Sequence, residues 1–428
     1  MVRASAQYDT SRHVEERPGP LHAALRLTSL DALRGVALGG ICLANLTSFA
    51  GVWLMTLGDP RRTDASAKTT LFLIDWLIEG KCYALFALLF GVGFHRLASK
   101  AWTSRHAFHT FWARRMGCLV VVGIVHLFMM WNGDILTLYA CVGIGLPLVR
   151  HLPDHVLIRV AAVLFVLPIG MQCLVTMTNH ASEWGSLARV AADVKASWGL
   201  ADRSIFSMRL SSQWWEVVAS NVLGAIERPM TYLMTGRPFQ VMGQFLLGLW
   251  IGRQLFSGPT HEGRWFERMR WWALVVGLSL NAVYAVIKME TGAAFAPGAI
   301  GLLQSLVYHG GSTLLALGYA ATIVGGLECA PAQSRTCRLW SWFVPLGRMP
   351  LSVYLLQSLV GLVIFYGYGL GLSGAVPIVA LPALAATIVG LQRAGCVWWL
   401  QRYGSGPIER IWRRVAYGYT TGLVGRQA

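Results

Sequence analysis

Long apolar runs, separated by short polar stretches, dominate the pattern of the chain. A helix needs about 20 mostly apolar residues to cross a lipid bilayer. Ten runs approach this length, so the pattern predicts an all-α, polytopic integral membrane protein with about ten transmembrane helices. The predicted spans are residues 31–53, 81–98, 113–131, 134–150, 156–178, 238–256, 271–290, 300–326, 343–366 and 375–400.

Composition narrows the class of protein further. Hydrophobic residues make up 55% of the chain and charged residues 13%, whereas a soluble domain carries about 25% charged residues. A cytosolic enzyme, a secreted disulfide scaffold and a disordered tail are therefore excluded. The eight cysteines form no C-x-x-C pair, so we expect packing residues and neither a metal site nor a redox site.

The distribution of Lys and Arg predicts the orientation. With the N-terminus inside, most basic residues outside the spans fall in inner segments, as the positive-inside rule requires. The formal charge of +16 is then a topology signal of a bacterial inner-membrane protein with both termini cytoplasmic, and no nucleic-acid partner is expected. The predicted parts are a cytoplasmic tail (1–29), a transmembrane domain (30–401) with a long extracytoplasmic loop (178–237), and a second cytoplasmic tail (402–428).

The long loop has two interpretations. It contains Trp184, Trp198, Trp214 and Trp215 among charges of both signs. Aromatic side chains of this kind suit helices that lie at the bilayer surface. Such helices could form a lid over an outward-facing cavity, or they could be an interfacial addition without a role in a site.

His126 and Asp134 are the strongest candidates for chemistry. His126 lies between apolar neighbours near the outer end of the third span, and Asp134 follows a predicted tight turn at residues 132–133. An imidazole at this depth needs a partner or a cavity. Asp134 could cap the next helix or orient His126 as a catalytic base. A packing histidine is the alternative.

Other polar positions occur at span ends. Arg34 follows Asp31 by three residues, which favours a local ion pair. Asn45 lies about three turns later on nearly the same face. Glu79 and Lys81 mark the outer entry of the second span. Each of these residues could belong to a site, or could serve as an interfacial anchor or a helix-packing residue.

The ninth span carries a polar face. Arg348 lies near its inner end, and Tyr354, Gln357 and Ser358 share one face farther along. This face could line a polar cavity, or it could hydrogen-bond to neighbouring helices.

Five ordered segments resemble a known family. They are LDALRG at 30–35, EGKCYALFALLFG at 79–91, GDILTLYA at 133–140 after His126, GRMPLSVYLLQS at 347–358 and GPIERIWR at 406–413. Together they resemble the YeiB-like family of multispanning bacterial membrane proteins, a domain of unknown function, over nearly the whole chain.

The resemblance extends more distantly to the transmembrane acyltransferase superfamily. It includes O-acyltransferases of surface glycans and the lysosomal heparan N-acetyltransferase, which take acyl groups from cytoplasmic acyl-CoA and deliver them across the membrane. The O-acyltransferase branch has a His eleven residues after the Arg of its opening motif. Here that Arg is Arg34 and the eleventh position is Asn45. Asn cannot act as a base, so the resemblance implies a base elsewhere, and His126 is the best candidate.

We therefore expect a membrane acyltransferase with acyl-CoA as co-substrate and no metal. Arg34 and Arg348 would bind the CoA phosphates, since Arg suits phosphate. His126, oriented by Asp134, would deprotonate the acceptor or carry the acyl group, and Lys81 or Asn45 would stabilise the oxyanion. The acyl chain would lie along polar side chains inside the bundle. These further binding residues would be Asn45, Glu79, Tyr354, Gln357 and Ser358.

Partners and alternatives follow from the same residues. The acceptor would be a sugar, a glycan or a lipid-linked molecule, held by the loop 178–237 at the membrane surface. The expected partners are this acceptor and membrane lipid. The sequence also leaves open whether the chain forms a homo-oligomer. A transporter or flippase is the alternative, with His126 and Asp134 as a proton relay. A structural or sensory protein, whose buried charges only fix helix pairing, is a third.

Overall fold

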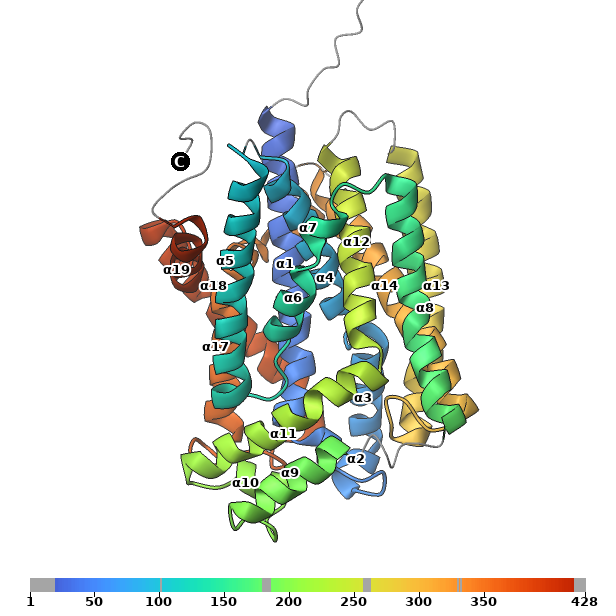
Figure 1. Cartoon of the computed structure of the whole chain (residues 1–428), viewed down its shortest axis with the longest axis vertical. Helices are drawn as coiled ribbons and strands as arrows, with labels where there is room; N and C mark the ends of the chain where they lie inside the picture. The colour runs from blue at the N-terminus through green and yellow to red at the C-terminus, as the bar shows by residue number, and fades with distance from the viewer. Residues whose placement is uncertain are drawn as a thin grey trace, which may run out of the picture.

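The computed structural model describes residues 20–100, 102–178, 186–256, 263–328, 331 and 333–418. All elements of the described chain are helices and none is a strand, which confirms the all-α prediction. Most of its long helices run along one axis (Figure 1). Residues 1–19 and 419–428 of the predicted tails lie outside the described residues.

The helices differ widely in length. The long ones are α1 (Pro20–Phe49), α4 (Lys81–Ala98), α5 (Arg105–Val125), α8 (Asp154–Thr178), α11 (Trp214–Met234), α12 (Arg237–Phe256), α13 (Gly263–Thr291), α14 (Ala299–Glu328), α17 (Pro350–Phe365) and α18 (Leu381–Tyr403). The shorter ones are η1 (Val52–Leu54), α2 (Pro60–Thr63), α3 (Ala65–Leu77), η2 (His126–Met130), α6 (Leu136–Gly143), α7 (Leu146–Val149), α9 (Ser186–Ser197), α10 (Ile205–Arg209), α15 (Arg335–Ser341), α16 (Val344–Gly347), η3 (Ile378–Ala380) and α19 (Pro407–Tyr417).

Within the described residues, seven helices are long and apolar enough to cross a membrane, or eight if the bent pair Arg335–Gly347 and Pro350–Phe365 counts as one span. Every one of the ten predicted ranges contains helix, but 134–150 is short and 238–256 carries several polar residues. The count of ten therefore stays a prediction.

The bend of 82° in the ninth predicted span has a local cause. Pro350 begins α17 and has no backbone N–H to continue the preceding helix. Its ring also disfavours helical backbone at the residue before it, and Met349 accordingly has φ −128° and ψ 50°. The apolar run thus folds as a short first piece, α16, and a separate helix, α17.

The outward faces of the helices are apolar, as expected for helices in contact with lipid. Large apolar side chains there are strongly exposed, for example Leu148 at 82% and Leu391 at 70%. Exposed apolar surface on this scale marks contact with a membrane or a partner. Together with the apolar helices, it supports a multi-pass membrane location.

Two glycines let the bent pair approach α1 closely. A Cβ on Gly347 would lie 1.7 Å from the carbonyl oxygen of Asp31, and one on Gly35 would lie 2.1 Å from that of Phe343. Only glycine fits such contacts between backbones. This packing fixes the position from which α17 starts.

The long loop forms helices of its own. α9, α10 and α11 lie at the end of the bundle opposite the first turns of α1, and α11 runs across the other helices (Figure 1). α11 contacts η2, α8, α9 and α12. It is therefore packed onto the bundle.

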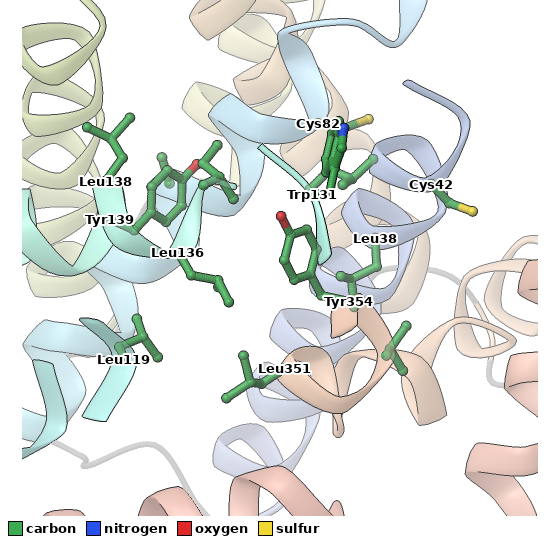
Figure 2. Packing of buried hydrophobic residues seen from close by; sticks show 14 of the residues in the cluster. Leu38, Cys42, Cys82, Leu119, Trp131, Leu136, Leu138, Tyr139, Leu351 and Tyr354 are labelled. Carbon is green, nitrogen blue, oxygen red and sulfur yellow. The ribbon is translucent and has the colours of Figure 1, made fainter. Parts of the chain in front are cut away.

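The main core gathers residues from both halves of the chain. Leu38 from α1, Leu136 from α6 and Leu351 from α17 belong to one buried cluster with Tyr354 and Trp131. Figure 2 shows Tyr354 between Leu136 and Leu38, with its hydroxyl toward the segment that carries Trp131. The predicted polar face of the ninth span thus enters the centre of the bundle.

Candidate functional site

His126 begins a π-helical turn. α5 ends at Val125, and the next five residues form η2 before the chain reverses. Single π turns inside helices occur frequently at functional sites. The His126 side chain is completely buried, so its two ring nitrogens depend on protein partners.

These partners are a hydroxyl and a carboxylate. Nε2 of His126 lies 2.8 Å from Oγ of Ser358 in a hydrogen bond. Nδ1 lies 3.0 Å from Oδ1 of Asp134, a close contact whose angle falls outside hydrogen-bond geometry. With the proton on Nδ1, facing the carboxylate, Nε2 can accept the hydroxyl proton. A serine, a histidine and an aspartate in this order form the arrangement that activates a nucleophile.

Asp134 contacts both the start of α6 and His126. Its side chain accepts hydrogen bonds from the backbone N–H of Leu136 (3.1 Å) and Thr137 (2.7 Å), and so caps α6. The same carboxylate faces His126. Its backbone oxygen accepts a hydrogen bond of 2.9 Å from the hydroxyl of Tyr232 on α11. The turn that carries Asp134 is therefore held by contacts with α6, with His126 and with Tyr232 of α11.

The polar face of α17 splits between two environments. Ser358 and Tyr354 face His126, whose ring centre lies 5.1 Å from that of Tyr354. Gln357 instead donates to the carbonyl of Leu38 (3.3 Å) and to the side chain of Gln392 (3.1 Å). Gln357 thus links α17 to α1 and α18, as the packing alternative predicted.

The start of α17 is held by Glu409, which sequence reasoning missed. The buried carboxylate of Glu409 on α19 accepts hydrogen bonds from the backbone N–H of Leu351 (2.7 Å) and Ser352 (3.0 Å), and from the Ser352 hydroxyl (2.5 Å). These N–H groups have no partner within their own helix. The segment GPIERIWR was the available signal, because it contains this glutamate.

A polar cavity of about 780 Å³ lies at the α11 end of the bundle. Asn45, Glu79 and Tyr83 line it, and the Tyr83 hydroxyl donates to the side chain of Asn45. Trp131 also lines it, while the Trp131 ring lies 6.4 Å from the His126 ring and perpendicular to it. Trp131 therefore adjoins both the cavity and the buried histidine.

Charged side chains gather at the base of this cavity. Lys288 forms an ion pair with Asp75 at 2.7 Å, and Lys81 donates to the backbone oxygen of Asp75. Arg237 donates to the hydroxyl of Tyr308 at 2.9 Å. Sequence reasoning missed this cluster, because Arg237 and Lys288 lie at the ends of predicted spans, where charged residues are common. Glu79 lines the same cavity.

The predicted site residues thus form separate groups. No contact joins Lys81 or Asn45 to His126 in the described structure, so the geometry does not bring either one to the base. Lys81 is fully buried among the charges beside the polar cavity at the α11 end. Asn45 belongs to the cavity wall.

Arg34 lies on α1, and Arg348 lies at the end of α16. Arg34 donates to the Asp31 carboxylate at 2.8 Å, which is the predicted local pair. The charges of Arg348 and Arg96 also act on Asp31. Arg348 caps the end of α16, on the other side of the bend from Ser358 on α17. Arg34, Arg96 and Arg348 thus gather around Asp31, and the bend separates Arg348 from the helix that carries the buried serine.

Within the described residues, no group of three His, Cys, Asp or Glu side chains could hold a metal ion.

Comparisons with known proteins find a family model that matches part of the chain and relatives that match most of it. Residues 250–419 match the family model described as "Protein of unknown function (DUF418)". The chain is 28% identical to the uncharacterized protein YxaH of Bacillus subtilis (strain 168) over 404 residues, which cover 92% of this chain and 94% of YxaH. It is 27% identical to the uncharacterized protein YeiB of Escherichia coli (strain K12) over 405 residues, which cover 91% of this chain and 96% of YeiB. No solved structure was found to match. These matches support the resemblance to the YeiB-like family that the five sequence segments indicated.

Proposed function

We propose that the protein is a membrane-embedded acyltransferase, which moves an acyl group from cytoplasmic acyl-CoA to an extracytoplasmic acceptor. The observation that carries the proposal is the contact of His126 with both Ser358 and Asp134. A hydroxyl, a base and an orienting carboxylate suit acyl transfer through a covalent intermediate. The distant resemblance to transmembrane acyltransferases implies the same reaction class.

The reaction has two balanced halves. In the first, Oγ of Ser358 attacks the thioester carbonyl while Nε2 of His126 takes the hydroxyl proton. The C–S bond breaks, the proton passes from His126 to the leaving thiolate, and an acyl ester forms on Ser358. In the second, His126 takes the proton of the acceptor hydroxyl or amine as it attacks the ester, and returns it to Oγ. Asp134 holds the imidazole and stabilises its charged form.

In the proposed topology, each end of the helix bundle has a role. We propose ten spans, with both termini cytoplasmic and the bilayer being the bacterial inner membrane. Arg34 and Arg348 would then bind the CoA phosphates from the cytoplasm, since arginine pairs well with phosphate. The cavity beside α11 would open outward and receive a sugar, a glycan or a lipid-linked acceptor. In this proposal α11 forms part of the acceptor site.

Trapping the acyl intermediate tests the reaction directly. The purified protein is incubated with labelled acetyl-CoA and with longer acyl-CoAs, and its peptides are analysed by mass spectrometry. We expect label on the peptide that contains Ser358, and no label in Ser358→Ala or His126→Ala. Ser312→Ala is the matched control, because Ser312 is also fully buried but lies on α14. Label that persists in Ser358→Ala would rule out the serine intermediate.

A transporter or flippase is the second candidate. The observation that favours it is the ion pair of Asp75 with Lys288 on the wall of a polar cavity, because charges at membrane depth often mark a substrate or proton pathway. Substrate flux into proteoliposomes without any acyl donor would support transport. Flux that requires acyl-CoA would support acyl transfer.

A further inference from the structure

The outer cavity carries more positive than negative charge. Its basic lining residues come from α2, α3, α11, α12 and α13, and its acidic ones are fewer. The basic residues are Arg62, Lys68, Arg228, Arg237 and Lys288. The acidic residues are Asp75, Glu79 and Glu290. A cavity lined in this way attracts anions, and its low-dielectric walls strengthen the attraction.

The basic side chains divide into two groups. Lys288 and Arg237 have partners in Asp75 and Tyr308. In the described structure, no carboxylate lies in ion-pair contact with Arg62, Lys68 or Arg228. Three cations on three different elements thus face the cavity without a carboxylate to pair with.

Arg228 shows this most clearly. Its guanidinium lies 4.9 Å from the ring of Tyr232. Its Nε is buried and has no hydrogen-bond partner among the described residues. A buried guanidinium N–H without an acceptor is unfavourable. A phosphate group is the acceptor that its geometry suits best.

Two other groups need different partners. Oε2 of Glu79 and both ring nitrogens of His309 are buried without hydrogen bonds in the described structure. His309 is only 1% exposed, lines the cavity and stacks on Phe295 with ring centres 5.6 Å apart. Glu79 requires a donor, and a neutral imidazole requires one donor and one acceptor. Hydroxyl groups supply both.

We propose that this cavity binds a phosphorylated polyol. The phosphate would contact Arg228, with Arg62 and Lys68 nearby, and the hydroxyl groups would contact Glu79 and His309. A neutral sugar would leave the cations without an anion, and inorganic phosphate would leave Glu79 and His309 without partners. The volume of about 780 Å³ lies in the usual range for small-molecule sites. That this ligand is also the acyl acceptor rests on the proposed function.

The phosphorylated polyol could be a soluble phosphate ester or the headgroup of a lipid. For the soluble source, binding to the purified protein in neutral detergent is measured by calorimetry with glycerol 1-phosphate, glycerol and inorganic phosphate. For the lipid source, the same protein in nanodiscs of phosphatidylcholine, with and without phosphatidylglycerol, is titrated with glycerol 1-phosphate. Competition by phosphatidylglycerol would identify the headgroup, and unchanged affinity would identify the soluble ester.

Glycerol 1-phosphate should bind more tightly than either glycerol or phosphate. Arg228→Gln should weaken it about tenfold, the usual effect of losing one charge-assisted hydrogen bond. Lys68→Gln is a second variant at an exposed position, and it should weaken binding without affecting folding. Arg189→Gln removes the same charge from α9, away from the cavity, and should leave binding unchanged.

Three results would overturn the proposal. They are equal binding of glycerol and glycerol 1-phosphate, equal binding of inorganic phosphate and glycerol 1-phosphate, and equal weakening by Arg189→Gln and Arg228→Gln. Absence of binding in a protein that melts cooperatively would also overturn it. Binding that persists while no acyl-Ser358 forms would keep this site and reject the proposed reaction.

Discussion

Ser358 and His126 lie 232 positions apart in the chain, and a hydrogen bond of 2.8 Å joins Oγ of one to Nε2 of the other. The contact requires two local departures from regular helix. One is the π turn that begins at His126, and the other is the break at Pro350 that starts α17 as a separate helix. The proposed chemistry thus depends on how these two elements are held.

Asp134→Asn separates the two roles of this residue. Asn is as good a helix cap as Asp, so the free energy of unfolding should change by less than about 1 kcal/mol. Asn lacks the charge that orients and stabilises the imidazolium, so the rate of acyl transfer should fall about a hundredfold or more. Asp134→Ala should lose the cap as well, and unfold more easily by about 1–2 kcal/mol. Thermal melts and acyl-Ser358 formation measure the two effects. Full activity in Asp134→Asn would show that Asp134 is only a cap.

Glu409→Gln tests how α17 is positioned. The carboxylate accepts from two backbone N–H groups at the start of this helix. Gln keeps one acceptor but loses the charge that favours a helix N-terminus, so the protein should be destabilised by about 1–3 kcal/mol. Asp202→Asn, at an exposed position beyond α9, is the control for loss of a carboxylate. Denaturation in detergent measures both variants, and equal stability of the two would contradict the positioning role.

Gly347→Leu should disrupt the packing of α16 on α1. Its Cβ would fall 1.7 Å from the backbone oxygen of Asp31, and backbone atoms cannot yield as a flexible side chain can. Overpacking of this kind costs about 1–3 kcal/mol or more. Gly390→Ala on α18 is the matched control, because nothing lies within 4 Å of its added Cβ, and Ala favours helix there. The yield of folded protein and its melting temperature are the readouts.

Sequence reasoning succeeded where periodicity and length determine structure. The long apolar runs predicted an all-helical protein, and every predicted range contains helix. The number and the bounds of the helices were predicted less well where an apolar run contains residues that interrupt a helix. Pro350 divides the ninth range, and residues 144–145 separate α6 from α7, because local backbone preferences outweigh the continuity of an apolar pattern. Span number is thus less predictable than helix content.

At the candidate site, the sequence predicted one contact, that of His126 with Asp134, but not the partner of each polar residue on α17. His126 and Asp134 are close in the chain, so a turn between them already predicts their contact. Ser358 was grouped with Gln357 and Tyr354 by helical spacing. The spacing could not show that Ser358 faces His126 while Gln357 faces α1 and α18, since that depends on the rotation of α17.

The proposed orientation makes a prediction about labelling. Single cysteines are introduced into a variant without native cysteines, at Ser197 on α9 and at Arg402 near the end of α18. Both positions are exposed. A membrane-impermeant maleimide should label the Ser197→Cys protein in intact cells, and the Arg402→Cys protein only after the cells are opened. The reverse pattern would invert the topology and place the Arg34 end outside.

The Asp75–Lys288 pair distinguishes a structural role from a role in transport. Lys288→Met leaves the Asp75 carboxylate without its main partner, and breaking a buried pair costs about 3–5 kcal/mol. The pair is partly exposed, with side chains at 22% and 14%, so about 2 kcal/mol is expected. The double variant Asp75→Leu/Lys288→Met buries no unpaired charge and should recover most of that loss. If the pair only stabilises the cavity wall, the double variant should also form acyl-Ser358 at the normal rate. If the pair carries protons for transport, the double variant should fold but lose flux, because neither Leu nor Met can titrate.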